Sequence, residues 1–282
     1  MLKEWPLVAF TILGQMAVGV CLLVVLPLSL YAGSHFFWTM ARDTMLVFLT
    51  LVFGLLAAAA ALSFFHLHHP FRARRVLTNL RTSWLSREIL FELVFMALIA
   101  LAFALVWTDH TAGLFFNAVL AAASIAGILF LISMTKLYML STLPVWNLAY
   151  TPLSFAATTL NLGALLTALV LWARSGFGYY SGGLLGLSFV LVVCEFVLAV
   201  LALPRYGVFE KRPAPSLRPP AATPRLLCLW RLEILAASLV FIGLGLLLWR
   251  AIILLAIALL LVLAGEVAGR FHFYGLVARP GR

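Results

Sequence analysis

Long, uninterrupted runs of apolar residues constrain this chain more than any other feature of its sequence. A helix of roughly 20 apolar residues crosses the ~30 Å hydrocarbon layer of a membrane, where lipid offers no partner for an unpaired backbone amide or carbonyl. Eight such runs occur, at about 7–31, 44–65, 89–107, 113–135, 152–173, 184–203, 229–249 and 251–271. The sequence therefore predicts an all-α integral membrane protein with eight transmembrane helices.

The composition excludes the soluble alternatives. The 282 residues are 65% hydrophobic and only 10% charged, which is far from the composition of soluble domains. Only Arg250 separates the last two runs, but about 40 apolar residues are too many for one crossing, so two spans are expected. The first run lacks a clear small-residue cleavage site, and we expect a retained helix rather than a signal peptide.

A weak internal match leaves open an arrangement of two fused four-helix halves, which would form two four-helix bundles. Pro6 and Leu7 precede Gln15 in the first span, and Pro152 and Leu153 precede Asn161 in the fifth. Each pattern places one amide side chain in the first half of its span. Gln15 and Asn161 are therefore candidate intramembrane polar residues.

The basic residues are strongly asymmetric across the predicted topology. With eight spans, both termini and the connections between spans 2 and 3, 4 and 5, and 6 and 7 lie on one side of the membrane. That side holds sixteen of the nineteen Lys and Arg residues. The other three, Arg42, Arg174 and Arg250, lie on the opposite side. The positive-inside rule makes the terminal side cytoplasmic. A docking surface for an acidic partner would produce the same asymmetry. The longest connection on that side, 204–228, is Pro-rich and basic and is predicted to be a flexible loop.

Two glutamates and a histidine are the first candidates for chemistry. Glu88 and Glu92 lie one helical turn apart at the start of the third span, on one face. His66 ends the second span, at the same membrane depth and on the same side as Glu88. Such a pair of proton acceptors is what quinol oxidation needs, because the ring releases two protons with its two electrons. The alternative is that these residues only mark the membrane boundary.

Other charged residues in the spans have more ordinary interpretations. Glu195, near the middle of span 6, is either a structural hydrogen-bond donor or part of a proton path or ligand cavity. Glu266 and Arg270 have the spacing of an ion pair within one helix. Glu233, together with Arg231, is expected to fix the start of span 7.

The sequence argues against metal cofactors in this protein. A membrane haem needs histidines on facing helices inside the bilayer, and the six histidines all lie at or near predicted span ends. Cys21, Cys194 and Cys228 are single and far apart, so no iron–sulfur cluster or disulfide framework is expected. No motif for nucleic-acid binding or hydrolytic catalysis appears.

Four stretches together resemble the membrane anchor subunit of the dimethyl sulfoxide reductase family. They read EWPLVAFTILGQMAVG at 4–19, HLHHPFRARRVLTNLRTSWLSREI at 66–89, KLYMLSTLPVWNLAYTPLSF at 136–155 and GEVAGRFHFY at 265–274. The resemblance implies a haem-free multi-pass protein of the bacterial inner membrane that acts in anaerobic respiration. It implies that the protein binds menaquinol or ubiquinol and has two partners, a four-cluster iron–sulfur subunit and a molybdopterin catalytic subunit. Reduction of the terminal substrate would occur in the catalytic partner.

The resemblance also assigns candidate roles to residues. His66 and Glu88 would be the quinol-oxidising pair. The secondary quinol-site candidates are Glu92, His68, His69 and Arg72. The residues expected to dock the iron–sulfur subunit, together with Arg72, are Arg74, Arg75 and Arg81.

Three alternative functions remain open from the sequence. In the reductases that this protein resembles, the terminal side is thought to face the periplasm, whereas the sixteen-to-three distribution indicates the cytoplasm. An anchor of a cytoplasm-facing sulfite-oxidising complex would instead pass electrons into quinone. A multi-span transporter that uses Glu195 is the alternative from another class. A structural tether without a quinone site is the third.

Overall fold

The computed structural model is entirely helical over the residues that it describes. These residues are 5–29, 35–66, 79–111, 114–140, 146–175, 178–211, 222–248 and 252–275. The helical elements are α1 (Trp5–Val20), the π-helical η2 (Cys21–Val25), α2 (Leu26–Ser29), α3 (His35–His66), α5 (Trp84–Trp107), α6 (Leu114–Tyr138), α7 (Tyr150–Ser175), α8 (Tyr179–Lys211), α9 (Ala222–Leu247) and α10 (Ile252–Gly275).

The prediction of eight membrane spans is confirmed. Eight segments of the described residues are long and apolar enough to cross a membrane, and α1, η2 and α2 together form the first of them, Trp5–Leu28. Two helices extend past the predicted span ends: α8 continues to Lys211, and α9 begins at Ala222. Parts of the predicted 204–228 loop are therefore helical, and residues 212–221 lie outside the described residues.

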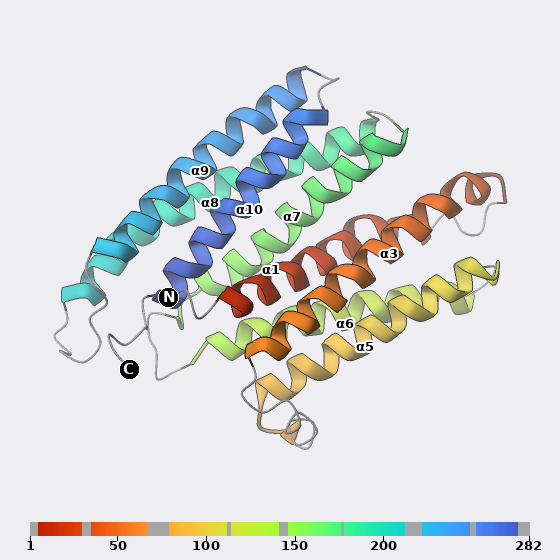
Figure 1. Ribbon diagram of the computed structural model, residues 1–282, viewed down its shortest axis with the longest axis horizontal. Coiled ribbons are helices and arrows are strands. Elements are labelled where there is room, and N and C mark those ends of the chain that lie inside the picture. Colours follow the sequence, from red (N-terminus) through yellow and green to blue (C-terminus); the bar gives the residue numbers. More distant parts are fainter. Residues whose placement is uncertain are drawn as a thin grey trace.

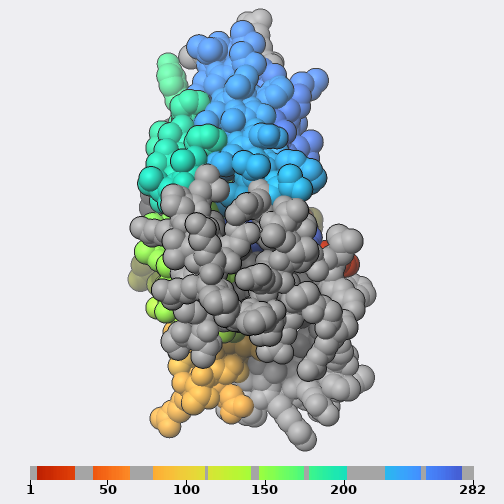
Figure 2. All heavy atoms as spheres, turned by 90° about the vertical axis from the view of Figure 1, so that its left-hand side faces the viewer, coloured from red at the N-terminus to blue at the C-terminus, as the bar shows by residue number. Residues whose placement is uncertain are grey.

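The helices form two groups of four with the same internal arrangement (Figure 1). In the first group α1 packs on α3, α3 on α5 and α5 on α6. In the second group α7 packs on α8, α8 on α9 and α9 on α10. The start of α1 and the end of α10 lie at the same end of the bundle, here called the terminal end (Figure 1). Figure 2 looks onto this end, with α8 and α9 at one extreme and the start of α5 at the other.

The two groups meet where α1 crosses α7 at a pair of glycines. A Cβ atom on Gly163 would lie 2.6 Å from Cα of Gly19, and one on Gly19 would overlap the carbonyl oxygen of Thr159. The two backbones are therefore in direct contact. Small residues at such crossings let helices approach closely enough for van der Waals attraction to hold them together in lipid.

A second link between the groups uses the π-helical segment of the first span. One extra residue in a helical turn disturbs the regular hydrogen-bond ladder. Tyr180 of α8 donates a hydrogen bond from its hydroxyl to the carbonyl oxygen of Leu23 within η2. This contact lies toward the end of the bundle opposite the terminal end.

We predict that Gly19→Ala destabilises the protein by about 2 kcal/mol or more, because the new methyl group meets backbone that cannot move aside. The control is Gly186→Ala in α8, where a Cβ atom would meet nothing within 4 Å. Thermal unfolding of both variants in detergent measures the effect. Equal melting temperatures for the two variants would contradict the close contact.

Candidate functional site

Glu88 and Glu92 are buried near the terminal end of the first group, and neither forms an ion pair with another described residue. Glu88 is 2% exposed and Glu92 is 5% exposed. The Oε1 atom of each carboxyl lacks a hydrogen-bond partner among the described residues. A carboxyl group withdrawn from water without a partner costs free energy, so this arrangement favours a functional role over a structural one.

The sequence just before Glu88 fixes where α5 begins. Ser83 is the N-cap, and its side-chain oxygen accepts a hydrogen bond from the backbone amide of Ser86 at 3.3 Å. Arg87 donates to the carbonyl oxygens of Leu80 and Arg81 at 2.8 and 2.7 Å. These contacts hold the preceding turn and place Glu88 one turn into the helix.

Two tyrosines bring the helix groups together beside Glu88. Tyr274, at the end of α10, donates its hydroxyl proton to the hydroxyl oxygen of Tyr138, at the end of α6, over 2.9 Å. Glu88 in the first turns of α5 and Tyr138 at the end of α6 lie at the same end of this packed pair of helices. Trp146 and Phe273 stack at 5.1 Å beside this pair, so the polar groups lie in an aromatic surround.

The other predicted quinol-site residues are described only in part. His66 is the last residue of α3, and its side chain lies outside the described residues. The end of α3 lies near the start of α5 in Figure 1. His68, His69, Arg72, Arg74 and Arg75 also lie outside them. Arg81 is exposed at the terminal end. The His66–Glu88 pairing therefore stays a prediction.

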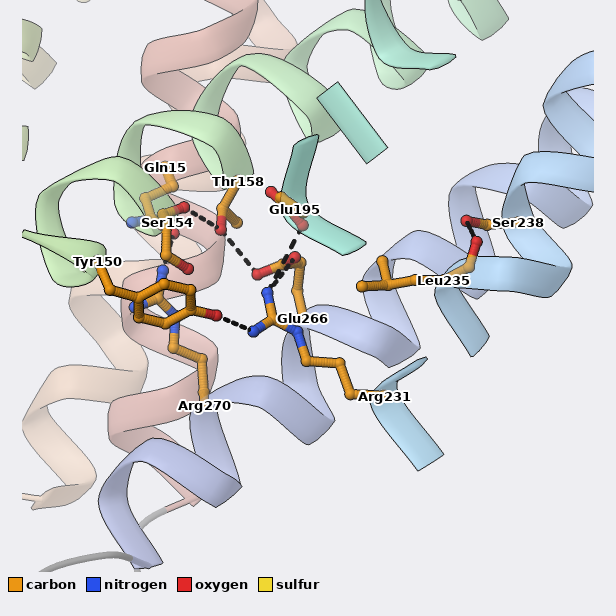
Figure 3. Close-up of polar contacts among 10 residues, drawn as sticks. All are labelled: Gln15, Tyr150, Ser154, Thr158, Glu195, Arg231, Leu235, Ser238, Glu266 and Arg270. Atoms are coloured by element: carbon orange, nitrogen blue, oxygen red, sulfur yellow. Dashed lines mark hydrogen bonds and ion pairs between the residues drawn. The ribbon is translucent and has the colours of Figure 1, made fainter. Parts of the chain in front are cut away.

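The second group contains a buried ion cluster that the sequence did not predict (Figure 3). The Nη2 atom of Arg231 lies 3.3 Å from Oε1 of Glu266 and 3.6 Å from Oε2 of Glu195. Its Nη1 atom donates to the hydroxyl of Tyr150 at 2.5 Å, and Thr158 donates to Oε2 of Glu266 at 2.7 Å. One guanidinium thus offsets two carboxyl groups from different helices.

Two expectations about these charges were wrong. Arg231 does not mark the helix start beside Glu233: it is 6% exposed, whereas Glu233 is exposed. Glu266 pairs with Arg231 across helices rather than with Arg270 along its own helix. Arg231 belongs to the buried stripe that runs from Cys228 through Leu235, Ser238 and Ile242, and this helical spacing was the available signal.

Both predicted intramembrane amides are completely buried. Gln15 accepts a hydrogen bond from Nη2 of Arg270 at 2.9 Å, and Arg270 also lies 3.7 Å above the ring of Phe155. Asn161 accepts a hydrogen bond from the hydroxyl of Ser188 at 2.5 Å. Arg270 thereby ties α10 to α1, and Asn161 ties α7 to α8.

The two groups treat their buried charges differently. The buried stripe of α5 includes Glu88, Glu92, Phe95 and Ile99, and that of α9 includes Cys228, Arg231, Leu235 and Ser238. Arg231 pairs with Glu195 and Glu266, whereas the described residues provide no ion pair for Glu88 or Glu92.

No group of three or more His, Cys, Asp or Glu side chains in the described ranges could hold a metal ion.

We predict that Arg231→Met alone destabilises the protein by about 3–5 kcal/mol, because it leaves two buried carboxyl groups without their cation. Adding Glu195→Gln and Glu266→Gln should restore most of the loss, since both charges are then removed. Unfolding by titration with a denaturing detergent measures both variants, with Arg174→Met at an exposed position as the control. No rescue by the two glutamines would refute the charge compensation.

Comparisons with known proteins identify the family. The family model for the DMSO reductase anchor subunit (DmsC) matches residues 1–276. The protein is 30% identical over 284 residues to the YnfH subunit of an anaerobic dimethyl sulfoxide reductase of Escherichia coli K12, covering 97% of the present sequence and 94% of the relative. It is 28% identical over 285 residues to the C subunit of the anaerobic dimethyl sulfoxide reductase of the same organism, with the same coverage. The C subunit from Haemophilus influenzae is 29% identical over 280 residues, covering 98% of the present sequence and 95% of the relative. This protein belongs to the DMSO reductase anchor subunit family and is a multi-pass protein of the bacterial inner membrane.

Proposed function

We propose that this membrane anchor binds menaquinol or ubiquinol beside Glu88, oxidises it, and passes the electrons to an iron–sulfur subunit. The observation that carries the proposal is the pair of buried carboxyl groups, each with an unpartnered oxygen, at the terminal end of α5. No haem or iron–sulfur cluster in the anchor itself is needed, because the nearest cluster of the partner would take the electrons.

The residues around Glu88 suit a quinol ring. Oxidation of the ring releases one proton from each hydroxyl, so an acceptor within hydrogen-bond reach of each oxygen is required. Glu88 would accept the first proton. His66, which ends the neighbouring helix α3, is the proposed acceptor for the second, with Glu92, His68, His69 and Arg72 in supporting roles. The aromatic residues near Tyr138 would pack against the ring and exclude water.

The proposed direction of electron flow follows the names of the relatives, which are subunits of dimethyl sulfoxide reductases. A four-cluster iron–sulfur subunit would dock on Arg74, Arg75 and Arg81, of which Arg81 is described and exposed shortly before the start of α5. A molybdopterin subunit would then reduce the terminal substrate. Electron flow in the opposite direction, into quinone, is the second candidate, favoured by the concentration of Lys and Arg on the terminal side.

We predict that Glu88→Gln and His66→Ala each lower quinol-dependent turnover of the assembled complex by roughly 10²-fold or more, because each removes a proton acceptor. Activity in membranes and binding of a quinol-analogue inhibitor are the measurements. An artificial reductant that feeds electrons directly to the partner subunits should restore activity, which separates quinol oxidation from assembly.

Glu233→Gln, which changes an exposed carboxyl of α9, is the matched control and should leave turnover unchanged. Unaltered turnover and inhibitor binding in both the Glu88 and the His66 variants would remove the proposed site.

We also predict that the triple charge reversal of Arg74, Arg75 and Arg81 to Glu abolishes co-purification of the iron–sulfur subunit. Opposed charges steer and hold such an interface, and reversal makes them repel. Arg174→Glu, at the end of α7 on the opposite side, is the control. Retention of the partner by the triple variant would show that docking uses another surface.

A further inference from the structure

The helix face that carries Glu88 and Glu92 begins one turn earlier, at Trp84, the first residue of α5. Trp84 precedes Glu88 by four residues, as Glu88 precedes Glu92, so the three side chains share one face. Side chains in a helix lean toward its N-terminal end, so the carboxyl group of Glu88 is directed toward the turn that Trp84 begins. The indole ring of Trp84 therefore borders the carboxyl pair on the side of the terminal end.

An arginine holds this indole ring in place. The guanidinium carbon of Arg87 lies 4.2 Å from the centroid of the Trp84 ring, within the range of a cation–π interaction. The same guanidinium donates from Nε and Nη2 to the carbonyl oxygens of Leu80 and Arg81 at 2.8 and 2.7 Å. Because these two hydrogen bonds fix the guanidinium, the ring stacked on it is also fixed.

The ring at the other end of the carboxyl pair is closed off. Phe95 follows Glu92 by three residues on the same buried stripe and is fully buried. It packs against α6, where a Cβ atom on Gly127 would lie 3.4 Å from its ring. Trp84 is half-buried instead, and Figure 2 shows the start of α5 at the surface of the terminal end. Of the two rings that border the carboxyl pair along this stripe, Trp84 is the one with accessible surface.

We propose that the indole of Trp84 packs against the head group of the quinol and is a binding residue of the quinol site. This inference rests on the proposed function, because it takes Glu88 as the proton acceptor for the same ring. A quinol ring is flat and aromatic, and a fixed indole offers it a stacked contact one helical turn from that acceptor. The contact is the same before and during proton transfer, so it strengthens binding and does not accelerate the chemical step.

Steady-state kinetics of the assembled complex in membranes separate these two effects. Trp84→Leu keeps an apolar side chain but removes the ring, and it should raise the KM for quinol about tenfold while kcat stays within about twofold. Trp84→Phe restores an aromatic ring and should keep the KM within about threefold of the original value. The dissociation constant of a hydroxyquinoline N-oxide, a quinol-analogue inhibitor, should rise by the same factors as the KM.

Trp107→Leu is the matched control, because it removes the exposed indole at the opposite end of the same helix. Both kinetic constants should be unchanged in this variant. Turnover with an artificial reductant and co-purification of the iron–sulfur subunit report whether each variant complex is assembled.

An unchanged KM in Trp84→Leu, with a lowered kcat in Glu88→Gln, would overturn this inference and leave the quinol site at Glu88 standing. Loss of the iron–sulfur subunit from Trp84→Leu, with an unchanged KM in the complexes that remain, would assign the ring to partner docking and also overturn it. An equal rise of KM in the Leu and Phe variants would exclude ring stacking. If neither Glu88→Gln nor Trp84→Leu alters quinol turnover, the proposed function and this inference fail together.

Discussion

The cost of an uncompensated charge in hydrocarbon governs the polar interior of this protein. The buried Glu, Arg, Gln and Asn side chains described above lie in the halves of their helices nearest the terminal end, where water is closest. Most are matched: Arg231 faces Glu195 and Glu266, and Arg270 meets Gln15. Such pairing is the usual requirement for charge below the membrane surface. Glu88 and Glu92 lack such a partner among the described residues, and this difference identifies the candidate site.

The packing of the two helix groups against each other explains how the buried carboxyl groups of Glu88 and Glu92 are tolerated. Both groups share one packing order, and the direct backbone contact of Gly19 with Gly163 joins them. The tyrosine pair formed by Tyr138 and Tyr274 lies across their junction beside Glu88. The second group thus pairs its buried carboxyl groups with Arg231, whereas the described residues offer no such cation to Glu88 and Glu92 in the first group.

The sequence predicted the spans well because the length and polarity of each run follow directly from the thickness of the membrane. The sequence could place Glu88 and Glu92 on one face because two residues one turn apart share a helix face whatever the rest of the fold does. Arg231 was assigned to a helix end and Glu266 to Arg270, because sequence spacing shows contacts within one helix and not those between helices. The contact between α9 and α10 that buries Arg231 beside Gly269 depends on packing that no local pattern contains.

Photolabelling with an azido-substituted quinone tests the central claim most directly, because it reports where the ring lies without a mutation. The assembled complex would be labelled in native membranes and the modified peptides identified by mass spectrometry. The account predicts label at the start of α5 and at the end of α6, and its loss when excess unlabelled quinone is added. Label confined to α9 and α10 would place the ring in the second group and contradict the account.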